Sequence, residues 1–362
     1  MDAPPVARLA MSQSILVRAP NWLGDTVMAL PFLASLKATA PESRVTCLCR
    51  PDLAPLLSRA VGIDGVLPLD ETHGARGWRS LQRNAKRLRA HRFHLGFCLP
   101  PSFGAAFMLW RAGVKRRIGY ASDHRRLFLT ESRPYLPNGR RAHRVEGYLA
   151  LLECVWRNPT QISQVTFDPG DESRRDAVSL LRQCGVPTGP AILAIGPGSA
   201  QPSRIWFTER YRAIALRWLD SRAGVVIALG SHSEQDLCAR ALSGLDTSRA
   251  FTLAGRASIL QTTAILEKAR VYLGNDSGLA HLAAAVGAPT VVISGPGDPN
   301  EVEPRGRTVL SVKEEVFCAP CYRGHCWRTD HPLECLDKVT TEEVWHQIDG
   351  MSQQTPDPRS RH

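Results

Sequence analysis

The 362-residue chain contains no apolar run that approaches the roughly eighteen residues needed to cross a bilayer. Its first fourteen residues hold two prolines and no apolar core, so they do not resemble a secretory signal peptide. We therefore expect a flexible tail over 1–14 and a cytoplasmic location. In that compartment the 10 cysteines are expected to stay reduced and unpaired.

Two further absences narrow the function. Neither half of the chain has Gly-x-Gly-x-x-Gly after its first strand-like run, which argues against a dehydrogenase. Acidic residues are outnumbered, 34 against 45 Lys and Arg, so the formal net charge is +11. Much of this excess lies between Arg111 and Arg144, and it points to an anionic partner: nucleic acid, acidic lipid or a phosphorylated substrate.

Strand-like and helix-like segments alternate along the chain, and 43% hydrophobic residues suffice for two cores. The first series has strands over 15–17, 45–49, 66–67 and 94–99 and helices over 26–38, 81–89, 103–112 and 145–156. After a turn-rich linker over 158–170, the second has strands over 191–195, 225–229, 271–273 and 290–293 and helices over 209–220, 234–242, 259–269 and 279–286. This alternation predicts an α/β protein of two Rossmann-like, doubly wound domains facing a central cleft, where ligands are expected.

The octet Gly-Asn-Asp-Ser-Gly-Leu-Ala-His over 274–281 is the most informative motif. It follows a short apolar run and opens a helix-like segment. Free N–H groups at such a helix start, with small side chains around them, can bind a phosphate. Asp276 and Ser277 stand where N-cap residues belong, and His281 leans back towards the same end. An ordinary capped helix with a half-buried histidine is the alternative interpretation.

Loops at the carboxyl ends of other strands add candidates. Asp25 is either the N-cap of the helix after it or a carboxylate presented to the cleft. Ser199, in a glycine-containing loop, could contact phosphate, and Arg204 could add a charge-assisted bond to a pyrophosphate. Glu234 is either a helix cap or an acceptor for ribose hydroxyls.

Together these segments resemble the heptosyltransferases of lipopolysaccharide core assembly, glycosyltransferases of the GT-B fold. The resemblance covers about 15–344 and is most specific in four motifs: Asn-Trp-Leu-Gly-Asp over 21–25, Pro-Ser-Phe over 101–103, Pro-Gly at 197–198 through Arg204 and Trp206, and the stretch 275–281. The first and third motifs are most similar to heptosyltransferases that add the second heptose. Arg204 stands where the family usually has lysine.

The resemblance implies an inverting transfer of heptose from ADP-L-glycero-D-manno-heptose. Asp25 would be the general base on the acceptor hydroxyl. Donor contacts would come from seven residues: Ser199, Arg204, Glu234, Asp276, Ser277, Gly278 and His281. No cofactor and no catalytic metal are implied, since a helix N-terminus and a cation can stabilise the leaving diphosphate.

The implied domains are an acceptor-binding domain over 15–160, a nucleotide-sugar-binding domain over 171–340, and a C-terminal helix and tail over 341–362. The implied acceptor is a heptosylated, 3-deoxy-manno-octulosonate-bearing lipid A at the cytoplasmic face of the inner membrane. Acceptor contacts are assigned to Ser102, Arg116, Arg117, Arg125 and Arg126. Such an anionic acceptor would account for a basic set that is otherwise a solvated face: arginines 111, 116, 117, 125, 126, 133, 140, 141 and 144.

Four late cysteines, Cys318, Cys321, Cys326 and Cys335, form a separate pattern. A Cys-x-x-Cys followed by two more thiols could bind zinc, but a second Cys-x-x-Cys is missing, and we favour an inert or stabilising role. The other six cysteines, at 47, 49, 98, 154, 184 and 238, are expected to be small core residues.

Three alternatives stay open. The chain could be a GT-B glycosyltransferase with another nucleotide sugar, or a sugar-nucleotide epimerase of similar fold. It could also be a non-catalytic basic protein that binds nucleic acid, although aromatic residues are not interleaved with the basic run and no nucleic-acid motif is present. The sequence leaves open the acceptor sugar, the linkage and the oligomeric state.

Overall fold

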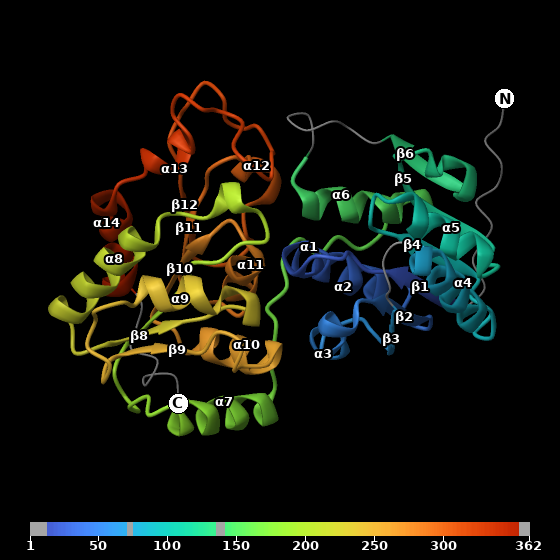
Figure 1. Ribbon diagram of the computed structural model, residues 1–362. Helices are drawn as coiled ribbons and strands as arrows, with labels where there is room; N and C mark the ends of the chain where they lie inside the picture. The colour runs from blue at the N-terminus through green and yellow to red at the C-terminus, as the bar shows by residue number, and fades with distance from the viewer. Residues whose placement is uncertain (1–12, 71–74, 135–141, 355–362) are drawn as a thin grey trace. The chain divides into compact units, whose positions relative to one another are not determined.

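The computed structural model describes residues 13–70, 75–134 and 142–354, which form two six-stranded parallel sheets flanked by helices (Figure 1). The chain divides into two compact units. The first comprises Met1–Asn21, Ala29–Pro137 and Val145–Ser163, and the second comprises Trp22–Met28, Asn138–Arg144 and Gln164–His362. The expected α/β class with two Rossmann-like sheets is confirmed.

The first sheet has the strand order β3-β2-β1-β4-β5-β6, and all its neighbours are parallel. Its strands are β1 (Ser14–Arg18), β2 (Arg44–Cys49), β3 (Gly65–Pro68), β4 (Leu95–Cys98), β5 (Arg116–Ala121) and β6 (Glu131–Pro134). Between them run α1 (Leu23–Met28), α2 (Leu30–Thr39), α3 (Ala54–Ser58), α4 (Ala75–Arg89) and α5 (Phe103–Arg111), with α6 (Arg144–Ala150) after β6. The central β1 is buried from Ile15 to Arg18, as expected of a parallel strand covered on both faces.

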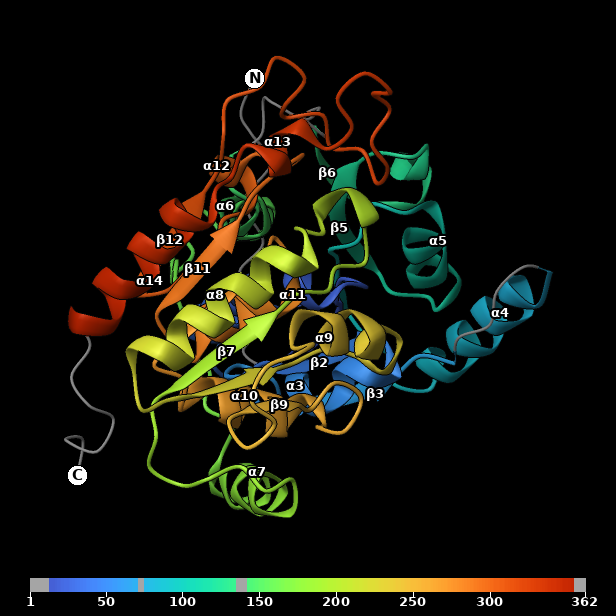
Figure 2. The ribbon, with the colours of Figure 1, turned by 60° about the vertical axis from the view of Figure 1, so that its left-hand side comes forward.

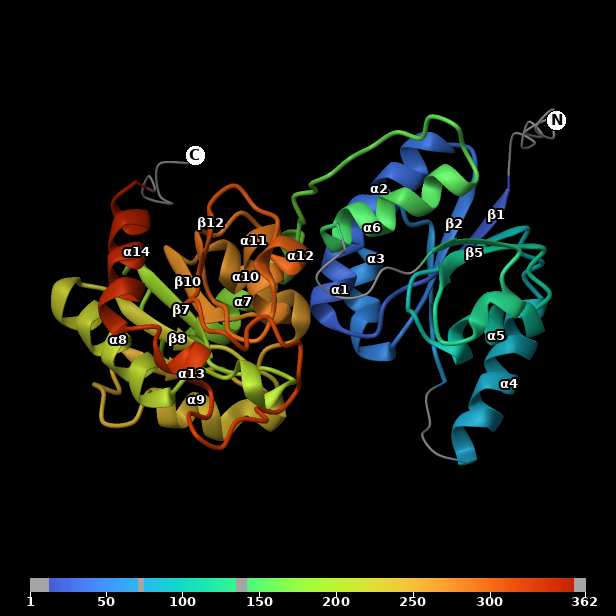
Figure 3. The same cartoon turned by 90° about the horizontal axis from the view of Figure 1, so that it is seen from above.

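The second sheet has the order β12-β11-β10-β7-β8-β9 and is also parallel (Figure 2). Its strands are β7 (Ile192–Gly196), β8 (Val225–Ala228), β9 (Ala250–Thr252), β10 (Val271–Asn275), β11 (Thr290–Ile293) and β12 (Val309–Val312). Its helices are α7 (Asp171–Gln183), α8 (Thr208–Ser221), α9 (Gln235–Ala241), α10 (Ile259–Glu267), α11 (Gly278–Ala285), α12 (Pro299–Val302), α13 (Glu334–Asp337) and α14 (Thr341–Gln354). Figure 3 shows β7 and β10 between a layer with α8 and α14 and a layer with α10 and α11.

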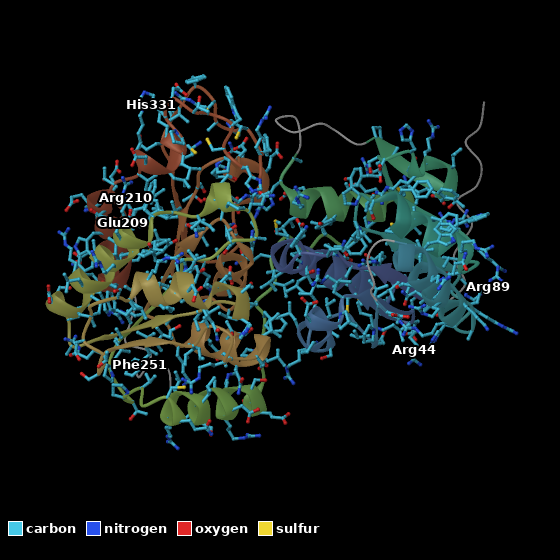
Figure 4. The ribbon with its side chains drawn as sticks, viewed as in Figure 1. Arg44, Arg89, Glu209, Arg210, Phe251 and His331 are labelled. Atoms are coloured by element: carbon cyan, nitrogen blue, oxygen red, sulfur yellow. The ribbon has the colours of Figure 1, made fainter. Side chains whose placement is uncertain are left out.

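One long side chain ties the C-terminal segment to this second unit. Arg210 on α8, labelled in Figure 4, donates hydrogen bonds to the backbone carbonyls of Leu336, Asp337 and Val339. Its guanidinium also pairs with the Asp337 carboxylate at 2.6 Å. The C-terminal helix expected beyond residue 341 is present as α14, which packs on α8 and on the sheet.

Several expected elements need correction. The single helix expected over 26–38 is two helices, because Pro31 cannot donate the backbone hydrogen bond that would continue α1 into α2. The helix expected over 145–156 ends at Ala150 and continues as a 3₁₀ turn, Leu151–Cys154. Two cysteines expected in the core, Cys154 and Cys184, are only partly buried, because they lie at the ends of this turn and of α7.

Candidate active site

The buried side-chain amide of Asn275 fixes the loop between β10 and α11. Asn275 accepts hydrogen bonds from the Trp206 backbone N–H at 3.0 Å and the Tyr211 hydroxyl at 2.9 Å. Its own amide donates to the carbonyl of Pro197 at 2.8 Å. Asn275 therefore joins β10 to the loop after β7 and to the segment that carries Arg204.

Just beyond Asn275, helices α1 and α11 approach each other closely. Both helices belong to the second unit. A methyl group on Gly278 would lie 2.7 Å from Leu23 Cβ, and one on Gly24 would lie 2.9 Å from His281 Cδ2. Only glycine leaves room for this contact. The two glycines therefore bring Asp25, in the first turn of α1, to the N-terminal end of α11.

Asp276 is almost fully buried, with 6% of its surface exposed, and pairs with the Arg204 guanidinium at 2.9 Å. Burial raises the pKa of its carboxyl, and the Arg204 charge partly offsets that rise. Asp25 pairs with Arg144 at 3.5 Å. Burial likewise raises the pKa of Asp25, against the opposing charges of Arg144 and Arg204.

His281 completes the cluster as a neutral side chain. It is 4% exposed, and burial, assisted by the charges of His143, Arg204 and Arg144, lowers its pKa to about 3. Ser277 occupies the N-cap position of α11 without a side-chain capping hydrogen bond. The first N–H groups of a helix lack partners within the helix, so this end of α11 keeps donors for an anion.

The structure thus brings together six residues singled out from the sequence: Asp25, Arg204, Asp276, Ser277, Gly278 and His281. It adds Arg144, which the sequence placed only in a general basic face. No local pattern could have linked Arg144 to Asp25, because the two are separated by more than a hundred residues. Two arginines and two carboxylates around a helix N-terminus can bind an anionic leaving group and accept a proton beside it.

Ser199 and Glu234 lie in the loops after β7 and β8. Glu234 forms a capping box with Ser231, whose backbone N–H donates to the Glu234 carboxylate at 2.7 Å. Glu234 therefore caps the turn after β8, its carboxylate also lies against Gly198, and its contact with a ribose stays a prediction. Asp25, in contrast, lies two residues beyond the start of α1 and not at its N-cap.

A family model described as "Glycosyltransferase family 9 (heptosyltransferase)" matches residues 81–330. The chain belongs to this family. It is 27% identical to lipopolysaccharide heptosyltransferase 2 of Escherichia coli K12, over 93% of this chain and 98% of that one. The structure of the E. coli ADP-heptose lps heptosyltransferase II has a TM-score of 0.78 at 21% identity and covers 94% of this chain and 99% of that one. A family 9 structure from Veillonella parvula has a TM-score of 0.84 at 20% identity, with coverages of 97% and 100%.

The residues expected to bind the acceptor of this family 9 glycosyltransferase belong to the first unit. Ser102 and Arg126 are exposed, while Arg116 pairs with Glu131 at 2.8 Å. Arg117 donates to the carbonyl of Phe128 at 2.6 Å. Arg140 and Arg141 lie outside the described residues.

The prediction that Arg125 contacts the acceptor needs correction, because its side chain is fully buried. It donates to the carbonyl of Tyr120 at 2.6 Å and to that of Pro100. A guanidinium held in this way is part of the internal structure of the first unit. It does not belong to an exposed basic face.

The four late cysteines line one small cavity together with Ser203 and Pro296. Among the described residues, no three His, Cys, Asp or Glu side chains form a group that could hold a metal ion. Burial, assisted by the neighbouring thiols, raises the pKa of Cys335 to about 11, so this thiol stays protonated at neutral pH. A family 9 mechanism without a catalytic metal stays a prediction.

The buried His281 makes stability depend on pH. The unfolded chain binds a proton below pH 6.5 that folded His281 does not accept, so the free energy of unfolding falls as the pH drops from about 6.5 towards 3. This group alone should lower the free energy of unfolding by about 2 kcal/mol between pH 7.5 and pH 5. The raised pKa values of Asp25 and Asp276 act in the opposite sense, and both carboxylates are present in every variant compared.

Urea unfolding at the two pH values measures the effect. His281→Gln should lose less stability on acidification than the parent, by about 2 kcal/mol. The exposed His94→Gln serves as the matched control and should behave like the parent. Equal losses in all three proteins would show that His281 titrates normally.

Proposed function

We propose that this glycosyltransferase moves heptose from ADP-L-glycero-D-manno-heptose to the inner core of lipopolysaccharide, with inversion at the transferred carbon. Two similar E. coli proteins support this choice of donor and acceptor: the lipopolysaccharide heptosyltransferase 2 that aligns along nearly all of both chains, and the ADP-heptose lps heptosyltransferase II of known structure. The observation that carries the proposal is the cluster of Asp25, Arg144, Arg204 and Asp276 at the start of α11.

The donor's diphosphate is held by Arg204 and by the N–H groups of the first turn of α11. The negative charge that develops on the leaving group is stabilised there by a helix N-terminus and a guanidinium. Asp276 fixes the Arg204 guanidinium by the 2.9 Å ion pair and offers its second oxygen to the sugar. Because Arg204 already supplies a fixed cation, this step needs no metal.

Asp25 takes the proton from the acceptor hydroxyl as that oxygen attacks the sugar. A carboxylate is a better base when its pKa lies closer to the working pH, and burial moves the pKa of Asp25 in that direction. Arg144 keeps the carboxylate ionised enough to act. His281 stays neutral and adds a polar ring without another positive charge.

The acceptor is proposed to be a heptosylated lipid A bearing 3-deoxy-manno-octulosonate, reached from the cytoplasmic face of the inner membrane. Its phosphates match the basic character of the chain. In the described part of the chain, no helix is long and apolar enough to cross a bilayer. We propose that the protein reaches this lipid by a peripheral contact.

Nucleotide selectivity tests the donor. ADP should raise the melting temperature more than UDP, GDP or NAD, because a ligand that binds only the folded state stabilises it by about 2.7 kcal/mol at a hundred times its Kd. A transfer assay with ADP-heptose should then give product on the heptosylated acceptor. A clear preference for UDP, or no transfer from ADP-heptose, would contradict the proposal.

Arg144 should control the pH dependence of transfer. Removing its charge in Arg144→Gln raises the pKa of Asp25 further, so the acidic limb of kcat/KM should move to higher pH. Arg144→Lys keeps the charge and should restore most of the parent profile. A uniform loss of rate at every pH, with no shift, would mean that Arg144 acts only on folding or substrate binding.

A further inference from the structure

Helix α5 is apolar on two sides. Its inner stripe, with Ala105, Ala106, Met108 and Leu109, is buried in the first unit. Its outer stripe carries Phe103, Phe107 and Trp110, spaced at i, i+4 and i+7 on one face. Phe103 and Trp110 are 39% and 43% exposed. A helix that is apolar all round is normally covered by another surface.

Other residues extend this outer stripe. The Trp78 ring of α4 lies 5.0 Å from the Phe107 ring, and the Phe128 ring lies 5.1 Å from Phe103 and 5.4 Å from Trp110. Trp78 is 50% exposed and Leu127 is 84% exposed. We call these six residues the aromatic patch: Trp78, Phe103, Phe107, Trp110, Leu127 and Phe128. Contiguous exposed apolar surfaces of this kind mark interaction sites.

The same part of the chain holds all of the net charge. Residues 75–130 contain thirteen Lys and Arg and one acidic residue, Asp123, a formal charge of +12 in a chain of +11. The other 306 residues together therefore carry a charge of −1. Among the side chains of this segment that the structure describes, the exposed cations are Arg79, Arg83, Lys86, Arg87, Arg89, Arg92, Arg111, Lys115 and Arg126.

Three of these cations lie on the side of the rings. Around α4, Lys86 and Arg89 lie about 80° and about 20° from Trp78, because each residue advances the helix by about 100°. Arg111 lies over the Trp110 ring at 6.0 Å. Helices α4 and α5 are packed side by side, and Figure 4 shows Arg89 projecting from the end of α4.

We propose that the aromatic patch and its surrounding cations are the surface by which the enzyme docks on an anionic lipid bilayer. Tryptophan and phenylalanine side chains partition into the region between head groups and acyl chains, while Lys and Arg meet the anionic head groups. A second copy of the chain would bring two strongly positive surfaces together. A nucleic acid would use the cations but would leave the apolar stripe of α5 uncovered.

Vesicle binding by the full-length protein tests this surface. The unmodified protein, the parent, should co-sediment with phosphatidylglycerol–phosphatidylethanolamine vesicles and should not co-sediment with pure phosphatidylcholine vesicles. Trp78→Ser with Trp110→Ser should weaken binding by about tenfold or more, since each indole leaves the lipid phase. Lys86→Gln with Arg89→Gln should weaken binding by about fivefold for each cation at low salt.

The matched control is Phe317→Ser with Trp327→Ser, two aromatic residues of the second unit that are 80% and 52% exposed. This variant should bind vesicles like the parent, and all variants should keep the parent's melting temperature. Equal vesicle binding by the Trp78–Trp110 variant and the control would overturn the proposal. So would loss of binding to a short RNA in that variant while vesicle binding persists.

The idea that docking presents a lipid-bound acceptor rests on the proposed function. A second measurement tests the docking surface separately from the transfer activity. Transfer to a water-soluble, deacylated acceptor should be unchanged in the Trp78–Trp110 variant, whereas transfer to acceptor embedded in vesicles should fall in step with binding. Failure of transfer from ADP-heptose in the parent would reject the proposed function, and the vesicle-binding result would still decide the docking surface.

Discussion

The site depends on the close contact of α1 with α11, which Gly24 and Gly278 make possible. This contact places the carboxyl groups of Asp25 and Asp276 in one buried neighbourhood, where burial raises the pKa of both and the charge of Asp25 adds to the rise at Asp276. Arg144 and Arg204 oppose that rise, and each pairs with one carboxylate. Without the two cations, burial would raise the pKa of both carboxyl groups further. With them, the same pocket contains a proton acceptor and a fixed cation for a phosphate.

The arrangement divides two tasks that a single charged group could not perform. Arg204 is held by Asp276 and by the loop that Asn275 fixes, so it can meet a diphosphate with little reorganisation. Asp25 is held less tightly, at 3.5 Å from Arg144, and keeps basicity for a proton. A neutral His281 fits this division, because a third positive charge would lower the pKa of Asp25 further.

Sequence patterns indicated most of this architecture and the parts of the site that lie close together in the chain. The octet at 274–281 and the segment 21–25 each mark a short strand-to-helix junction, whose chemistry follows from local residue types. The pairing of Arg144 with Asp25 and the burial of Arg125 depend on contacts between distant segments, which no local pattern encodes. Glu234 shows the remaining ambiguity: a capping glutamate and a ligand-binding one look the same in sequence, and its capping box became visible only in three dimensions.

The most direct test concerns the basicity of Asp25. Asp25→Asn keeps the size of the side chain and removes the proton acceptor. We expect a melting temperature and an ADP affinity close to those of the unmodified protein, with kcat lower by about 10²- to 10⁴-fold, the usual range for loss of a general base. A variant that loses melting temperature and keeps its rate per folded molecule would show that Asp25 is structural and that the base lies elsewhere.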